Sequence, residues 1–406
     1  MKITLYNIRY WLLLLLVFLI AYSSHPSIMD LNNEEEITRG TVLSPYIALV
    51  FNVLMLLCIR TKPFLRSRMI GNTFVMLLVL VLFYLITMGF FGTQAMLLDI
   101  RGIFISLVAI MIGWQIELDS KKQYVVLLLY AVLVLYVGLM QVFVNIGSFE
   151  ILEEYKSDNK NSLGVMLAGA SFIFLYLGIN SKQIDWKRII LLCLFVLTIV
   201  VLLTIRARSA TLALMAMSLF LFFKRLNKRY LLVTVSIVTF AVVFLYYLQV
   251  YFYPDIIDYI VKSFYLHHED DLTTGRMERN IVGLHFLSDH LWLGNLDVKA
   301  KIGWIHNYPL EKLFKFGLVF SLPLLVVYVY IFVKAWRNSV RSDSHNITNI
   351  GYYLLLIPYI ISLSEPTFPF GPGTACAFNF ILFGMSIRQT DLIREKFIQN
   401  KIIFIK

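Results

Sequence analysis

Long apolar runs recur along the whole of this 406-residue chain and restrict its fold more than any other feature. Most of the runs are about 15–24 residues long, and a helix needs about 20 apolar residues to cross a membrane. Hydrophobic residues make up 59% of the sequence and charged residues only 15%. The runs therefore predict an all-α, polytopic membrane protein in which residues 1–406 form a single integral membrane domain.

We expect about twelve membrane-spanning helices, with one large outward-facing loop at 251–305 between the ninth and tenth. The expected spans are about 8–22, 42–59, 72–91, 98–117, 123–146, 162–179, 189–204, 210–223, 230–250, 310–333, 351–363 and 374–387. The first run resembles a signal peptide. No small-residue cleavage site follows it cleanly, so we interpret it as a retained helix.

Lysine and arginine gather in every second loop, and the loops between them are acidic or neutral. Cytoplasmic loops carry the excess of positive charge in membrane proteins, so the pattern places both termini in the cytoplasm. The 251–305 loop, the turn at 206–208 and the loop that begins at Glu365 then face outward. Because the net charge of +11 sets orientation, it does not indicate a nucleic-acid partner.

Two arginines on the outer face are exceptions to this charge rule. Arg206 and Arg208 lie in a turn so short that both guanidiniums must sit at the membrane boundary, and Arg101 lies near the same level. Guanidinium groups bind phosphate oxygens in paired hydrogen bonds, so these arginines are candidates for binding an anionic substrate. The alternative is that each extends to lipid headgroups.

The large loop supplies further candidates. Arg276 follows two threonines and a glycine, which predicts a turn, and Arg279 lies one helical turn later if a helix begins there. His306 and Asn307 come immediately before the tenth span, and Tyr308 resembles an interfacial aromatic. A neutral imidazole can accept a proton from a hydroxyl group, which makes His306 a candidate base. The alternatives are a solvated charge for Arg279 and a cap or surface residue for His306.

A metal site is not expected. The His-His-Glu-Asp-Asp run at 267–271 groups possible ligands, but its spacing matches no calcium or zinc loop. Cys58, Cys193 and Cys376 form no metal-binding pattern either. We predict a solvated loop at 267–271 and no cofactor.

In order along the chain, several short segments resemble the O-antigen ligase and polymerase family. They are Arg-x-Arg-Ser-Ala at 206–210, Thr-Gly-Arg at 274–276, Leu-Gly-Asn at 293–295, His-Asn at 306–307 with Glu311, and Phe-Gly-Leu at 316–318. Asn-Ser-Leu-Gly at 161–164 also resembles the family's Asn-x-x-Gly. The segment around Gly294 departs from the family pattern, which has a proline and a second glycine there.

The resemblance implies an inverting glycosyltransferase with a GT-C-like fold, whose donor is a glycan on undecaprenyl diphosphate. It implies that Arg206, Arg208 and Arg276 bind the diphosphate, with Arg279 and Arg101 as further candidates, and that His306 is the base. Arginines that stabilise the leaving diphosphate remove the need for a metal. The implied location is a bacterial inner membrane, with the active site on the periplasmic side.

Two enzymatic functions fit the resemblance. The first is a polymerase that joins lipid-linked repeats into O-antigen, capsular or exopolysaccharide; the second is a ligase that transfers the glycan to lipid A-core or to a protein. The implied partners are the lipid-linked donor, a glycan or lipid A-core acceptor, membrane lipid and a chain-length regulator protein. A flippase for lipid-linked oligosaccharides is the alternative from another class, but transporters are expected to carry internal repeats and midspan charges, which we do not find.

Overall fold

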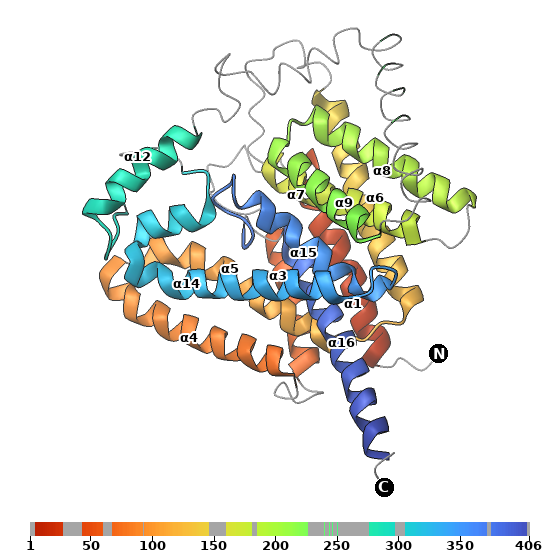
Figure 1. Ribbon diagram of the computed structural model, residues 1–406, viewed down its shortest axis with the longest axis horizontal. Coiled ribbons are helices and arrows are strands. Elements are labelled where there is room, and N and C mark those ends of the chain that lie inside the picture. Colours follow the sequence, from red (N-terminus) through yellow and green to blue (C-terminus); the bar gives the residue numbers. More distant parts are fainter. Residues whose placement is uncertain are drawn as a thin grey trace.

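A computed structural model of the protein describes residues 5–26, 43–59, 67–91, 93–145, 160–180, 185–225, 276–296, 305–371 and 375–403, with isolated positions between 239 and 250. Every regular element in these ranges is a helix, as predicted (Figure 1). The helices are α1 (Leu5–Tyr22), α3 (Ser44–Ile59), α4 (Arg68–Phe91), α5 (Thr93–Gln115), α6 (Ser120–Asn145), α7 (Lys160–Asn180), α8 (Trp186–Thr204), α9 (Arg208–Lys224), α12 (Arg276–Asp289), α14 (Tyr308–Arg341), η3 (Ile347–Asn349), α15 (Ile350–Ile361) and α16 (Ala377–Ile403).

Each expected span except the ninth coincides with one of these helices; most of the ninth, at 230–250, lies outside the described residues. Within the described part, six helices are long and apolar enough to cross a membrane: α1, α4, α6, α7, α8 and α14. The chain is therefore a membrane-embedded helical protein. The total of twelve spans and the GT-C-like arrangement stay predictions.

The centre of the bundle contains α7, α15 and the first half of α16. In the most apolar 18-residue stretch of α7, 89% is buried inside the protein, against 24% in the corresponding stretch of α4. Both helices are apolar on all sides, so packing rather than hydropathy separates an interior helix from one that faces lipid. On α4, Leu82, Leu85 and Ile86 are at least 60% exposed, a surface that is stable only against lipid.

Glycines allow α16 to approach its neighbours closely. A Cβ atom added to Gly113 of α5 would lie 1.9 Å from the carbonyl oxygen of Ile381, and one added to Gly384 would lie 2.1 Å from that of Ile110. Helices in lipid associate through such small residues because their backbones can then approach each other. These contacts fix α16 against α5.

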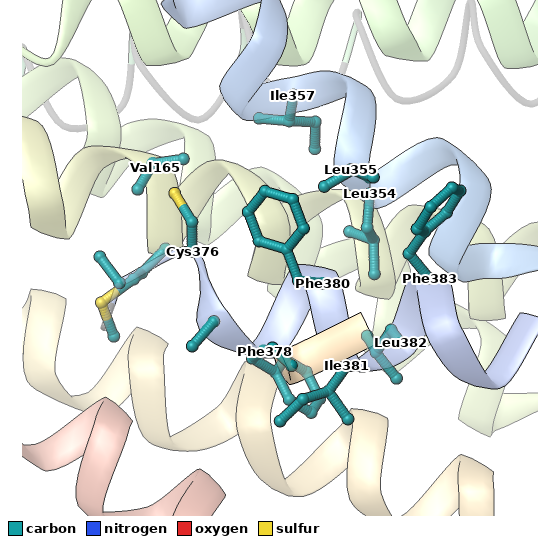
Figure 2. Packing of buried hydrophobic residues seen from close by; sticks show 14 of the residues in the cluster. Val165, Leu354, Leu355, Ile357, Cys376, Phe378, Phe380, Ile381, Leu382 and Phe383 are labelled. Atoms are coloured by element: carbon teal, nitrogen blue, oxygen red, sulfur yellow. The ribbon is translucent and has the colours of Figure 1, made fainter. Parts of the chain in front are cut away.

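Apolar side chains fill the space between α15 and α16. Figure 2 shows Leu354 and Leu355 of α15 beside Phe380 and Phe383 of α16, with Val165 of α7 on the other side of Phe380, near Cys376. All of these residues belong to one buried cluster. The loop between α15 and α16 is thereby held at one end of the core.

Polar contacts between helices gather at the two ends of the bundle. One end, here called the Arg388 end, holds the ion pair between Arg388 and Glu117, whose atoms Nη2 and Oε1 lie 2.8 Å apart. It also holds Arg225, which donates from Nη2 to Asn180 at 2.8 Å. The other end, here called the His306 end, holds His306 just before α14 and the turn between α8 and α9 with Arg206 and Arg208.

Candidate functional site

His306 lies directly before the first residue of α14. Asn307 caps this helix, because its side-chain oxygen accepts a hydrogen bond from the Leu310 amide at 3.1 Å. The helix then begins with Tyr308 and Pro309, as is common at helix N-termini. The predicted position of His306 before the tenth span is confirmed. The alternative that His306 caps the helix is not, because the cap is Asn307.

The segment with His306 is tied to the loop that follows α15. The Tyr308 amide donates to the Ser362 carbonyl at 2.9 Å, and the Asn307 side chain donates to the Leu363 carbonyl at 3.2 Å. The Tyr308 ring is 2% exposed and stacks on Tyr328, with ring centres 5.4 Å apart. Tyr308 is therefore a buried packing residue, and its location at the membrane interface stays a prediction.

This connection brings His306 beside an acidic side chain. Nδ1 of His306 lies 3.9 Å from Oε2 of Glu365, which accepts a hydrogen bond from Nδ2 of Asn161 at 3.0 Å. Glu365 is 5% exposed, whereas the His306 side chain is 24% exposed. We call these three residues the His306 cluster; it joins α7, α14 and the α15–α16 loop.

Sequence reasoning assigned no role to Glu365. One signal was present: Glu365 lies in a loop rich in proline and glycine that parity placed on the same face as His306. Its contact with Asn161 spans 204 positions of sequence, and no local pattern predicts such a pairing. Only the family resemblance indicated the Asn161 segment.

The turn between α8 and α9 packs beside the α7 end of this cluster. A Cβ atom added to Gly164, three residues after Asn161, would lie 2.7 Å from Cβ of Ala207. Ala207 is buried, and it separates Arg206 from Arg208. The structure therefore brings both predicted arginines to the end of the bundle that carries His306.

Arg206 has two unusual features. Its φ is 57°, in the left-handed region that few residues other than glycine adopt. Its guanidinium atoms Nε and Nη2 are buried within the protein, which a side chain extended to lipid headgroups does not require. Arg208 is half-buried and begins α9, where a positive charge adds to that of the helix dipole.

Arg276 and Arg279 lie on a helix that packs against the start of α14. Arg276 is the first residue of α12, so its backbone is helical rather than in the predicted turn, and a helix does begin there; its side chain lies outside what the structure describes. Arg279 is exposed one turn later. A Cβ atom added to Gly283 would lie 2.2 Å from the Phe314 ring, which shows how closely α12 contacts α14. The expected convergence of Arg276 with Arg206 and Arg208 stays a prediction.

Arg101 lies deeper in its helix than expected. The span was expected to begin at about 98, but α5 begins at Thr93, so Arg101 is about two turns inside it. The side chain is exposed. A Cβ atom added to neighbouring Gly102 would lie 2.7 Å from the carbonyl oxygen of Phe370, which puts Arg101 near the level of the α15–α16 loop. Extension to lipid stays open for this residue.

Two segments quoted for the family resemblance contact each other through glycines. Gly317 interrupts α14 with φ 66° and ψ 179°, which frees the Leu318 amide to donate to the Leu291 carbonyl at 2.7 Å. Gly294 also has φ 66°, and a Cβ atom on it would lie 2.3 Å from the Gly317 nitrogen. Only glycine fits either position. The contact fixes the loop after α12, at 291–295, to the kink in α14.

No group of three or more metal-ligating side chains occurs among the described residues, and the His-His-Glu-Asp-Asp run at 267–271 lies outside them. A cleft of about 280 Å³ lies at the Arg388 end, lined by Tyr6, Arg9 and Glu117 among others. It is remote from the His306 cluster, because it opens at the opposite end of the helices.

The described residues thus define a membrane-embedded helical protein in which a buried glutamate lies beside a partly exposed histidine and asparagine at one end of the bundle. In comparisons with known proteins, the chain matches no family model and no curated protein sequence. The chemistry of the residues at the His306 end is therefore what indicates a function.

Proposed function

We propose that the protein is an inverting glycosyltransferase that polymerises undecaprenyl-diphosphate-linked oligosaccharide repeats into a surface polysaccharide. The observation that carries the proposal is the contact chain from His306 through Glu365 and Asn161 to the Arg206 and Arg208 turn. It associates a potential base with phosphate-binding groups at one end of the membrane helices. Transfer from a lipid diphosphate to a sugar hydroxyl needs both.

The electrostatics of this end favour an anionic donor. Arg206 and Arg208 contribute two positive charges, and α7, α9 and α14 all begin here, so the positive ends of their dipoles lie nearby. Helix N-termini and guanidinium groups both bind phosphate oxygens. We assign diphosphate binding to Arg206 and Arg208, with Arg276, Arg279 and Arg101 as further candidates.

The reaction uses the acceptor hydroxyl as nucleophile. As its oxygen forms a bond to the anomeric carbon of the donor, the bond from that carbon to the diphosphate breaks, and His306 accepts the hydroxyl proton. The arginines stabilise the negative charge that develops on the leaving undecaprenyl diphosphate. The products are an extended glycan with inverted anomeric configuration, the free lipid diphosphate and a proton for release to water.

The charge distribution supports an orientation for this enzyme. Arg388, Arg225 and Lys224 lie at the Arg388 end, and cytoplasmic ends of membrane helices carry the excess of positive charge. We propose that the His306 end faces the periplasm of a bacterial cell and that both termini are cytoplasmic. The His306 end then binds lipid-linked repeats on the side of the membrane where the polysaccharide is assembled.

The test is reconstitution of the purified protein in vesicles with a lipid-linked repeat as both donor and acceptor. We expect release of undecaprenyl diphosphate and a ladder of glycans of increasing length. If undecaprenyl diphosphate is released only when lipid A-core is added, with one glycan transferred to each acceptor, the protein is a ligase instead. Movement of the lipid-linked repeat across the vesicle without diphosphate release would establish a flippase and overturn the proposal.

A further inference from the structure

Glu365 is a carboxylate held inside the protein. Its side chain is only 6% exposed, and a buried carboxylate is unfavourable unless donors surround it. Asn161 supplies one donor, at 3.0 Å from Oε2. The same oxygen faces Nδ1 of His306 at 3.9 Å, so the histidine is a second donor within reach.

The orientation of the His306 ring matches this arrangement. Nδ1 is buried on the side of Glu365, so the exposed 24% of the side chain belongs to the rest of the ring. A neutral imidazole has one nitrogen with a proton and one with a lone pair. A carboxylate beside Nδ1 favours the proton there, which leaves the lone pair on Nε2 to accept a proton from a substrate.

The separation of 3.9 Å is longer than a hydrogen bond, but the backbone on both sides is already fixed. Asn307, one residue beyond His306, donates to the Leu363 carbonyl, two before Glu365. Tyr308, two residues beyond His306, donates to the Ser362 carbonyl, three before Glu365. The backbone thus already holds the two side chains next to each other. Catalytic hydrogen bonds are often long without substrate and shorten when it binds.

We propose that Glu365 is the positioning residue of His306: its carboxylate, held by Asn161, binds Nδ1–H and directs Nε2 at the acceptor hydroxyl. The inference rests on the proposed function, since it needs His306 to act as the base. As the proton arrives at Nε2, the carboxylate also stabilises the imidazolium that forms. Glu365 itself stays ionised and touches no substrate.

The first test is Glu365→Gln. The amide keeps the shape of the side chain and an oxygen for Asn161, but it removes the charge that holds Nδ1–H. We expect kcat to fall about 10- to 100-fold, as misplaced catalytic groups do, with donor Kd unchanged. Glu117→Gln, which breaks an ion pair at the Arg388 end, is the matched control and should keep kcat. A loss of donor binding in the Glu365 variant would overturn the inference.

The second test combines Glu365→Gln with His306→Ala in single-turnover assays. If Glu365 acts through His306, the double variant is no slower than His306→Ala alone, because coupled residues are not additive. If the rate of the double variant falls by the product of the two single losses, Glu365 acts independently of His306. The inference then fails, while the assignment of His306 as the base stands. Full turnover by His306→Ala alone would overturn both.

A third variant serves as the control for a folding defect in Glu365→Gln. Glu365→Asp keeps the charge one methylene further away, and it should recover part of the activity lost in the amide variant. An aspartate variant with stable protein and no more activity than Glu365→Ala would contradict a positioning role.

Discussion

Arg206 combines a left-handed backbone conformation with a partly buried guanidinium. Backbone strain of this kind costs about 1–3 kcal/mol and gathers at functional sites. Asparagine tolerates the same left-handed conformation, so Arg206→Asn should change the free energy of unfolding by no more than about 1 kcal/mol. Donor affinity should fall about tenfold or more, because a charge-assisted hydrogen bond contributes about 1.5–3 kcal/mol. Thermal unfolding in detergent and donor Kd measure the two effects. If donor affinity were unchanged in this variant, the guanidinium would serve only the fold.

His306 can be compared with another histidine of the same loop region. We expect His306→Ala to lower polymer formation about 10²- to 10⁴-fold, the usual contribution of a general base, with normal protein level and donor Kd. His285 is exposed on α12, and His285→Ala should keep full activity. His290 is a poorer control, because its ring contacts Phe286 and Asn295. Released undecaprenyl diphosphate is the measurement, and equal activity in the two variants would remove His306 as the base.

At the scale of the element, the kink in α14 depends on Gly317. An added Cβ atom would lie 2.3 Å from the Gly294 nitrogen and 2.5 Å from backbone atoms of Trp292, at a positive φ. We therefore expect Gly317→Ala to lower the free energy of unfolding by more than about 2 kcal/mol. Gly89 of α4 has no atom within 4 Å of an added Cβ, so Gly89→Ala should be neutral or stabilising by about 1 kcal/mol. Thermal unfolding of the two variants side by side tests this, and equal melting temperatures would contradict it.

The helices could be predicted from the sequence because a long apolar run has few structures available in lipid other than a helix. Their ends were less predictable. Hydropathy locates the membrane boundary, whereas α14 continues to Arg341 and α5 begins at Thr93 because a helix does not stop at that boundary. The contact of Gly294 with Gly317 needs a positive φ at both residues, which hydrophobic periodicity does not indicate.

At the scale of the whole molecule, the polar residues are sorted between the two ends of one apolar bundle. Alternation of charge along the sequence predicted that His306, the arginine turn and Glu365 share one end, and the contacts among their segments agree with that grouping. The partners within that end were not predictable, since they depend on how α7, α14 and the α15–α16 loop pack. The sequence therefore indicates the face that carries the site, and packing selects the residues that meet there.

The orientation of the molecule is open to a direct test by reporter fusions. Because basic segments of membrane proteins stay in the cytoplasm, fusions at Asn227 and at His345 should be fluorescent with a reporter that matures only in the cytoplasm. A fusion at Asp270, in the large loop, should instead be active with a phosphatase that functions only outside the cytoplasm. Asn227 and Asp270 lie outside the described residues, whereas His345 is exposed at the Arg388 end, next to Ser344, which bonds Arg225. The reciprocal reporter at each position is the control. A phosphatase signal at Asn227 or His345 would place the Arg388 end outside and His306 in the cytoplasm, where no periplasmic glycan could reach it.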